Sequence, residues 1–168
     1  GNIVGAGHSG ATALLISEIG SWTSPVNGLE AHSNAQDGVF IFYFRGPIGN
    51  VKAWRNTNAG LYLTSVTPVT AITPTVDTAE VFGNVYNIAV NSTHAMLLRN
   101  IVANGDTSFS STHGLFLYAA TTNFGIILEN CDFSTVSGIK TANTNDITWG
   151  DSNTFAQIIT KDCKFGAG

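Results

Sequence analysis

A short phrase that recurs three times constrains the fold of this chain more than any other feature. Each copy begins with an apolar pair or an Ile-Thr pair. A charged residue comes next, then Asn or Asp, and then Ile or Cys. Residues 97–101 read LLRNI, 127–131 read ILENC and 159–163 read ITKDC. The copies begin 30 and 32 residues apart (127 − 97 and 159 − 127). A period of this size is typical of chains in which one supersecondary unit stacks on the next. We therefore predict a solenoid.

A second recurring phrase consists of short apolar alternations, mostly introduced by Gly. These alternations begin at residues 28, 60, 87, 114 and 138, at intervals of 32, 27, 27 and 24. Alternation with period two over a few residues is typical of strands, and the chain has no long stretch with the apolar spacing of an amphipathic helix. We predict an all-β protein.

The residues around the first phrase predict a corner in each repeat. Before the Asn or Asp the inward apolar residues have even numbers, as at Met96 and Leu98, and after it they have odd numbers, as at Ile101 and Ala103. Side chains alternate faces along a strand, so this change of parity requires a bend. The corner residues are Asn100, Asn130 and Asp162. Asn and Asp tolerate the left-handed conformation of a sharp bend, and we expect these side chains to stack and to hydrogen-bond as a ladder.

These corners and strands resemble the right-handed parallel β-helices of the pectate-lyase-like superfamily, of the kind found in phage decoration proteins and in tail spikes and fibres. The likeness spans residues 28–166, and besides the three corner residues it rests on the strands that begin at Gly60, Gly114 and Gly138. It implies a right-handed parallel β-helix of about six rungs, as a single domain over residues 1–168. We expect an irregular start at residues 1–27 and a loop insertion at 66–81, where Pro and Thr residues break the pattern.

Composition excludes several classes of partner. Charged residues make up only 11% of the chain, against about 25% in an ordinary soluble domain, and the net charge is −4. The chain lacks a cluster of Lys and Arg, which argues against nucleic-acid binding. It has no apolar stretch long enough for a membrane span, and its first residues do not form a signal peptide. We expect a protein on the exterior of a virion or, alternatively, an extracellular protein.

Two outward columns are predicted from the strand parity. They comprise Leu97, Ile127 and Ile159 on one strand and Tyr62, Phe116 and Tyr118 on another. A continuous apolar stripe marks an interaction surface. Because β-helices on phage particles are commonly trimeric, the resemblance implies a homotrimer that binds other virion proteins, either the major capsid protein or tail proteins. The alternatives are that the Thr-rich loop of the chain covers the stripe, or that the parity slips by one residue.

The resemblance also raises the alternative of a carbohydrate-active enzyme, which a pair of carboxyl groups would have to support. Glu129, Asp132 and Asp162 come together across repeats, but each has a structural explanation as an ion-pair partner or a corner residue. Asp146 and Asp151 flank a segment in which a sugar has room to lie against Trp149, although an ordinary turn explains that segment as well. We predict no catalytic residue.

The sequence predicts no metal site and no cofactor. Cys131 and Cys163 occupy the same place in adjacent repeats, roughly 4.8 Å apart if the repeats stack, which is compatible with a disulfide, although two buried free thiols are favoured. The Cys spacing is not that of a zinc or redox site, and the four His residues are scattered.

These features lead to a functional hypothesis. We expect the chain to be a non-enzymatic structural protein of a virus particle, a phage capsid decoration or cement protein that trimerises and binds the capsid lattice. The alternative is a β-helix domain of a tail fibre or tailspike that binds host polysaccharide as an adhesin or cleaves it as a lyase or glycosidase.

Overall fold

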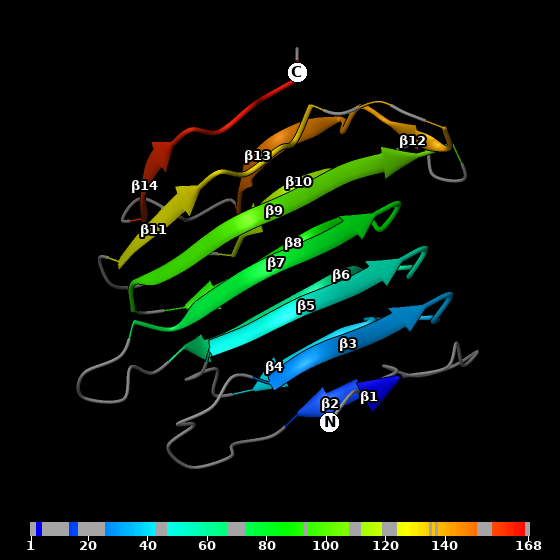
Figure 1. Cartoon of the computed structure of the whole chain (residues 1–168), viewed down its shortest axis with the longest axis horizontal. Coiled ribbons are helices and arrows are strands. Elements are labelled where there is room, and N and C mark those ends of the chain that lie inside the picture. The colour runs from blue at the N-terminus through cyan, green and yellow to red at the C-terminus, as the bar shows by residue number, and fades with distance from the viewer. Residues whose placement is uncertain are drawn as a thin grey trace.

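The computed structural model shows strands and no helix in the residues that it describes (Figure 1). The described residues are 3–4, 14–16, 26–42, 47–66, 73–92, 94–107, 112–118, 124–134, 136, 138–150 and 156–166. The first sheet contains β1 (Ile3–Val4), β3 (Val26–His32), β5 (Pro47–Trp54), β7 (Thr75–Phe82), β9 (Met96–Asp106), β11 (Phe124–Glu129) and β14 (Ala156–Lys161). The second sheet contains β2 (Leu14–Ile16), β4 (Val39–Phe42), β6 (Ala59–Val66), β8 (Tyr86–Ser92), β10 (His113–Leu117) and β13 (Asn145–Trp149).

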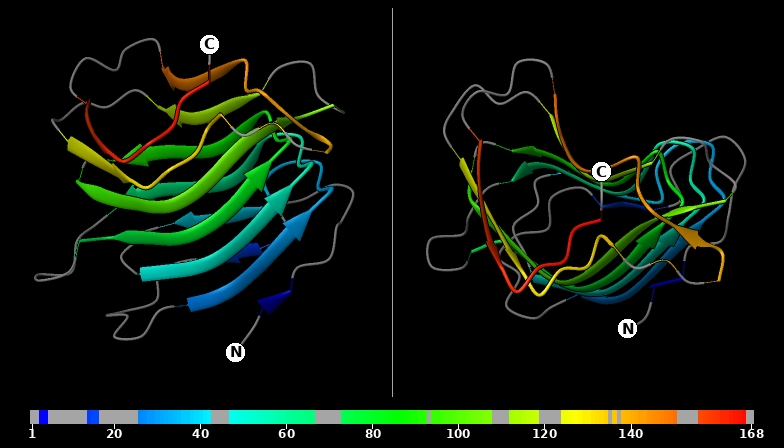
Figure 2. Two further views of the ribbon diagram at one scale, coloured as in Figure 1. Left: turned by 45° about the horizontal axis from the view of Figure 1, so that its top comes forward. Right: turned by 90° about the horizontal axis from the view of Figure 1, so that it is seen from above.

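Apart from the short β12 (Lys140–Thr141), consecutive strands alternate between the two sheets, so the chain crosses from one sheet to the other and returns one strand further along (Figures 1 and 2). Every pair within these two runs of strands is parallel, and the short β12 (Lys140–Thr141) pairs antiparallel with the end of β9. Parallel neighbours need a crossover connection, and here a strand of the opposite sheet lies within each crossover. The predicted all-β fold is confirmed for the described residues, and the arrangement is compatible with the predicted solenoid.

The first sheet bends along a single column of residues with positive φ. This left-handed column comprises Gly28 (φ 76°), Asn50 (51°), Thr78 (65°), Asn100 (54°), Asn130 (52°) and Asp162 (54°). The strand registers place them next to one another from β3 to the end of β14. A single left-handed residue turns a strand sharply, and Gly and Asn adopt that conformation at the least cost. The bend is visible when the stack is seen from above (Figure 2).

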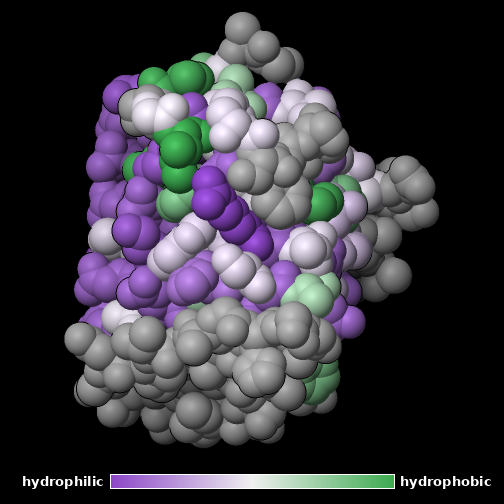
Figure 3. Space-filling model, turned by 90° about the vertical axis from the view of Figure 1, so that its right-hand side faces the viewer, coloured by the Kyte–Doolittle hydropathy of each residue, from purple (hydrophilic) through white to green (hydrophobic). Residues whose placement is uncertain are grey.

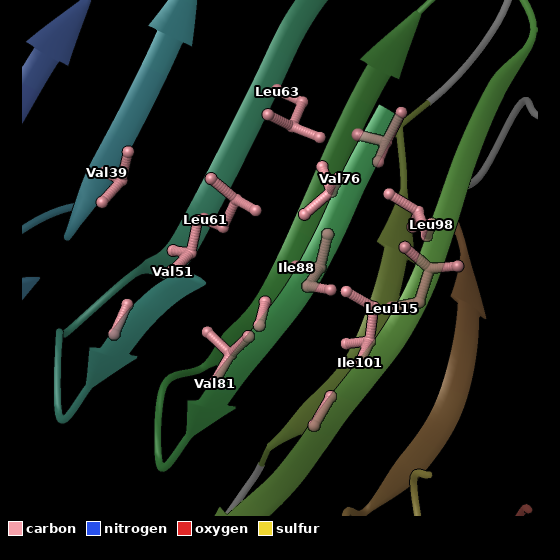
Figure 4. Packing of buried hydrophobic residues seen from close by; sticks show 14 of the residues in the cluster. Val39, Val51, Leu61, Leu63, Val76, Val81, Ile88, Leu98, Ile101 and Leu115 are labelled. Carbon is pink, nitrogen blue, oxygen red and sulfur yellow. The ribbon is translucent and has the colours of Figure 1, made fainter. Parts of the chain in front are cut away.

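The core lies between the two sheets. Met96 and Leu98 before the bend and Ile101 and Ala103 after it are all buried, which confirms the predicted change of parity. The second sheet contributes aliphatic columns that face them (Figure 4), and these columns include Val39, Leu61, Leu63, Ile88 and Leu115. Stacking like residues in adjacent layers produces a continuous apolar interior from strands that are each too short to bury a face alone.

Three sequence predictions need correction. Residues 75–81, assigned to the loop insertion at 66–81, lie in β7 between β5 and β9, because Val76, Ala79 and Val81 supply the inward alternation. The irregular start at 1–27 contains the short strands β1 and β2 as well as the first residues of β3. The alternation at Gly138 does not continue the second sheet, since its residues 140–141 form β12, and β13 is the strand that pairs with β10.

Candidate functional site

The predicted corner residues lie on the outside of the bend. Asn130 donates from Nδ2 to Oδ1 of Asn100 at 2.7 Å, and Asn100 donates from Nδ2 to Oδ1 of Asp77 at 2.8 Å. Asp162 follows Asn130 in register and in backbone conformation, and the Asn130 N–H donates to the Lys161 carbonyl oxygen at 2.9 Å. The three corner side chains are exposed, so this ladder of amides and carboxylates faces solvent.

Charges beside the bend alternate in sign from strand to strand. Arg99 contacts Asp77 at 2.7 Å, and Lys161 contacts Glu129 at 2.7 Å. The hydrogen bond from Arg99 lowers the pKa of Asp77, and the hydrogen bond from Lys161 lowers the pKa of Glu129. Exposed pairs of this kind add little to the stability of a fold, so they mainly favour this strand register over others.

The first predicted outward column is in register across three strands. Leu97 pairs with Ile127, and Ile127 pairs with Ile159. Ile127 is 38% exposed and Ile159 is 59% exposed, whereas Leu97 is partly covered. Apart from Phe42, the large hydrophobic residues that are exposed in the described chain lie between 127 and 165, near the end of the stack formed by β13 and β14. Figure 3 shows one side of the molecule, mostly hydrophilic with hydrophobic atoms gathered toward that end.

The second predicted column is part of a larger cluster on the outer side of the second sheet. We call it the aromatic face, and it comprises Phe40, Tyr62, Tyr86, His113, Phe116 and Tyr118. Its members contact one another in pairs with ring centroids 4.4 to 6.3 Å apart. Tyr62 and Phe116 stand on either side of Ala89 in the strand register. Ala89 is fully buried, although its neighbours Ile88 and Val90 are the residues that point into the core.

Two polar groups of the aromatic face have shifted pKa values. Burial, together with the neighbouring Tyr62 and Tyr86, raises the pKa of Tyr118 to about 12. Burial lowers the pKa of His113, whose Nδ1 lies 2.8 Å from Oγ1 of Thr148. The neutral forms of both side chains are therefore favoured, and the aromatic face carries no formal charge near neutral pH.

Trp149 lies in a different setting from the predicted one. It is the last residue of β13 and pairs with the core residue Leu117, so it extends an inward column at the end of the stack and is 43% exposed there. Asp146 lies in the same strand, and its Oδ2 accepts the backbone N–H of Gly166 at 2.6 Å. Asp151 lies outside the described residues.

Two adjoining hollows follow the bend on the outer face of the first sheet, with volumes of ≈ 370 and ≈ 270 Å³. They share Asn100 and Val102, so together they form one channel, which we call the outer groove. One wall is the left-handed column from Asn50 to Asp162, and the other wall is the next outward row, which comprises Lys52, Glu80, Val102, Asp132 and Lys164.

The two thiols are free. Cys131 is buried and Cys163 is half-buried, and burial raises the pKa of Cys131 to about 12. A thiol with so high a pKa is a poor nucleophile and a poor metal ligand. In the described ranges, no group of three or more His, Cys, Asp and Glu side chains is placed to hold a metal ion.

Two of the carboxylates considered for catalysis, Glu129 and Asp132, are held in ion pairs. Glu129 contacts Lys161, and Asp132 contacts Lys164 at 3.4 Å and accepts from the Ser134 hydroxyl at 3.0 Å. Asp132 and Asp162 line the same hollow.

The described part of the chain offers no helix with the length and hydrophobicity that crossing a membrane requires.

Sequence reasoning missed a second ladder, which lies inside the protein at the turns from the first sheet to the second. Each amide Nδ2 donates to the Oδ1 of the next residue at 2.7 to 3.1 Å, through Asn34, Asn56, Asn84, Asn87 and Asn143. The first three follow left-handed residues, Ser33, Arg55 and Gly83. The sequence does carry a signal for this ladder, which is the recurrence of Asn at intervals of 22 and 28 residues (56 − 34 and 84 − 56).

A stack of rings on the outer side of the first sheet also had no sequence prediction. His32 and Trp54 are stacked with centroids 4.4 Å apart, and Trp54 and Phe82 with centroids 6.1 Å apart. Lys52 and Lys140 lie over the rings of Trp54 and Phe82.

Comparisons with models of protein families, with curated proteins and with solved structures find no match for this chain.

Proposed function

We propose that this protein is a non-enzymatic structural component of a virus particle, a phage capsid decoration or cement protein that forms a trimer and binds the capsid lattice. The finer fold that we propose with it is a right-handed parallel β-helix of about six rungs. The observation that carries the proposal is the pair of outward apolar surfaces, the Leu97, Ile127 and Ile159 column on one sheet and the aromatic face on the other. Two such surfaces on different sides allow a rigid body to contact neighbouring copies and a lattice.

The structural role is also supported by the rest of the surface. The carboxylates beside the bend lie in ion pairs with Arg99, Lys161 and Lys164, and such pairs stabilise a register without serving as general acids or bases. Cys131 is buried with a raised pKa, which leaves it unsuited to nucleophilic chemistry. A rigid stack of parallel strands fits a role that depends on shape.

The competing proposal is a domain of a tail fibre or tailspike that binds or cleaves polysaccharide. It is favoured by one observation, the presence of Asp132 and Asp162 in the same hollow of the outer groove. Hydrolysis requires two such carboxyl groups, one of which keeps its proton to act as an acid. Release of reducing or unsaturated ends from polysaccharides, lost in Asp132→Asn and Asp162→Asn, would replace our proposal with this one.

Light scattering during size-exclusion chromatography tests the structural proposal. At micromolar concentration we expect a particle three times the 17.7 kDa mass of the chain. Ile127→Lys combined with Ile159→Lys is expected to reduce it to the monomer, because a charge cannot be buried in an apolar interface without a partner. Thr57→Lys, at an exposed turn position, is the matched control and should leave the trimer intact. A monomeric wild-type protein would contradict the proposal.

Attachment to the lattice is tested separately. Purified protein is mixed with phage particles of the source virus that lack it, and cryo-electron microscopy is used to look for added density at symmetric positions on the outside of the capsid. Density on the tail alone would favour the tail-fibre alternative, and the absence of added density from the whole particle would remove the virion role.

A further inference from the structure

The last layer of the described stack is paired on one side only. β13 pairs with β10 and β14 pairs with β11, and the described residues supply no strand on the far side of either (Figure 1). The inward columns therefore end in exposed side chains. Phe133 and Phe165 stack with ring centroids 5.5 Å apart, yet Phe133 is 1% exposed and Phe165 is 41% exposed. A further layer over this edge would bury Phe165 in the way that its own layer buries Phe133.

The backbone of β14 is directed to pair with such a layer. The carbonyl oxygen of Lys161 accepts from the Asn130 N–H at 2.9 Å, so the backbone groups of Lys161 face β11. Successive residues of a strand direct these groups to opposite sides, and Thr160 therefore directs its N–H and C=O away from β11, as does Ile158. A strand edge of this kind is a template for pairing with a strand of another chain.

The charges at this edge define what would pair with it. Two outward rows alternate in sign along the stack apart from Val102, and they consist of Asp77, Arg99, Glu129 and Lys161 and of Glu30, Lys52, Glu80, Val102, Asp132 and Lys164. Both rows end in lysines, whose side chains are 66% and 73% exposed. Acids in the same two rows of a following layer would place each lysine between two carboxylates, as Arg99 stands in register between Asp77 and Glu129.

The corner adds a further requirement. In its ladder each later layer donates to the earlier one, since Asn100 donates to Asp77 and Asn130 donates to Asn100. The exposed Asp162 carboxylate offers acceptor oxygens, so an Asn in the following layer would continue the ladder. The complementary sequence is therefore an acid, Asn, an apolar residue, an acid and an aromatic residue. Residues 129–133 of this chain, which meet β14 and the residues after it from the other side, have this pattern and read ENCDF.

We propose that the edge of β14 binds a parallel strand of a different protein in the same particle, and that this strand carries the pattern acid, Asn, apolar, acid, aromatic. The inference rests on the virion role proposed above and names the kind of partner that attaches at this end of the stack. A second copy of this chain fits less well. Its first strand, β1, has Val4 in the row of Lys164, so stacking the copies in register would leave that lysine opposite an uncharged residue.

Two labelled peptides test the pairing by fluorescence anisotropy. The acidic peptide copies residues 124–134 and the basic peptide copies residues 156–166, with the changes Cys131→Val and Cys163→Val to prevent oxidation. We expect the acidic peptide to bind about tenfold more tightly than the basic peptide. The difference should shrink at high salt, because salt screens charges that are exposed to solvent.

Three variants locate the binding. Lys161→Gln with Lys164→Gln should remove the preference for the acidic peptide. Lys52→Gln with Arg99→Gln is the matched control, because it removes one cation from each of the same two rows in inner layers, and it should leave the preference unchanged. Thr160→Pro removes an N–H that faces away from β11, which an edge strand tolerates, and should weaken binding of the acidic peptide by about tenfold or more. Circular dichroism and urea unfolding identify any variant that fails to fold.

Hydrogen exchange of the protein purified from its source shows whether the edge is open. We expect fast exchange at the amides of Ile158 and Thr160 in the free protein, and about tenfold slower exchange when the acidic peptide is bound. The proposal is overturned if neither peptide binds, if the two bind equally, or if the Gln double variant keeps the preference. It is also overturned if these amides are already protected in the free protein, since a segment of the same chain would then cover the edge.

Two further outcomes separate this inference from the proposals above. Oligomers that lengthen with concentration, and that Thr160→Pro abolishes, would make a second copy the occupant of the edge and overturn the choice of a different protein. If cryo-electron microscopy finds no added density on the particle, the virion role and the partner named here fail together, whereas the preference for the acidic peptide does not depend on that result. Loss of the peptide preference alone leaves the virion role standing.

Discussion

The rings of Tyr62 and Tyr118 stack with centroids 5.4 Å apart and an interplanar angle of 23°, although β8 separates β6, which carries Tyr62, from β10, which Tyr118 directly follows. They can meet because the residue of β8 in the row of Tyr62 is Ala89, which is fully buried. Because the side chain of Ala89 is small, the larger rings of the aromatic face can contact one another and form a second cluster outside the core. The aromatic face therefore depends on one alanine.

Enlarging Ala89 should disrupt the aromatic face. In Ala89→Leu the added carbons have no space beneath the rings, and we expect the free energy of unfolding to fall by about 1–3 kcal/mol. Urea unfolding measures the change, and near-ultraviolet circular dichroism reports the displaced tyrosines. The control is Ala35→Leu, at an exposed turn position, which should cost little. Equal effects of the two substitutions would show that Ala89 is not packed beneath the rings.

Alkaline pH should destabilise the protein in a defined range. Burial raises the pKa of Tyr118 from 10.0 to about 12 and that of Cys131 from 9.0 to about 12. Both groups hold their protons more tightly in the folded state, so the stabilisation is fully present below pH 9 and is lost as the pH rises toward 12. Urea unfolding at a series of pH values should show this loss, and Tyr118→Phe with Cys131→Ala should flatten the curve. A curve that rises between pH 9 and 12 would contradict the assignment.

The repeat in the sequence predicted the first sheet because its signal is local. Asn100 and Asn130 are flanked by apolar residues with a change of parity, and a bend in a strand is the only way to keep both flanks inside. The same reasoning failed at Thr78, since the phrase there reads VDTAE and a β-branched residue rarely adopts positive φ. Residues 75–81 therefore looked like a loop.

Contacts between distant segments explain the rest of what the sequence did not reveal. Gly60 and Gly114 were recognised as the starts of strands, but the reason for glycine lies elsewhere in the chain. A Cβ on Gly60 would lie 2.6 Å from Nδ2 of Asn84, and one on Gly114 would lie 2.6 Å from the backbone oxygen of Asp146. The buried Asn ladder and the neighbouring strand occupy that space. The outer groove was likewise hidden, because Lys140 reaches it from a strand that joins the sheet out of order.

Two buried asparagines should respond to the same substitution in opposite ways. Asn56 accepts from the backbone N–H and the side-chain amide of Asn34 and donates to Asn84, so Asn56→Leu removes three buried hydrogen bonds and should cost about 1–3 kcal/mol or more. Asn104 is also fully buried, but neither polar atom of its side chain has a partner within the described structure. Asn104→Leu removes those atoms and should be neutral or stabilising. Thermal and urea unfolding compare the two variants, and a larger loss in Asn104→Leu would indicate that its amide is satisfied.

The strain at Thr78 gives the last prediction. Thr78 has a φ of 65°, and a β-branched residue in this region costs about 1–3 kcal/mol, whereas Gly adopts it freely. Its hydroxyl contributes only an exposed hydrogen bond of 3.3 Å to Asp77. Replacement of Thr78 by Gly should therefore raise the free energy of unfolding by about 1 kcal/mol, even though Gly is unfavourable in most strands. In the same strand Thr75 has no positive φ, and Thr75→Gly should lower that free energy. Urea unfolding of both variants measures the difference in sign, and a loss of stability in both would mean that the backbone at Thr78 is not left-handed in solution.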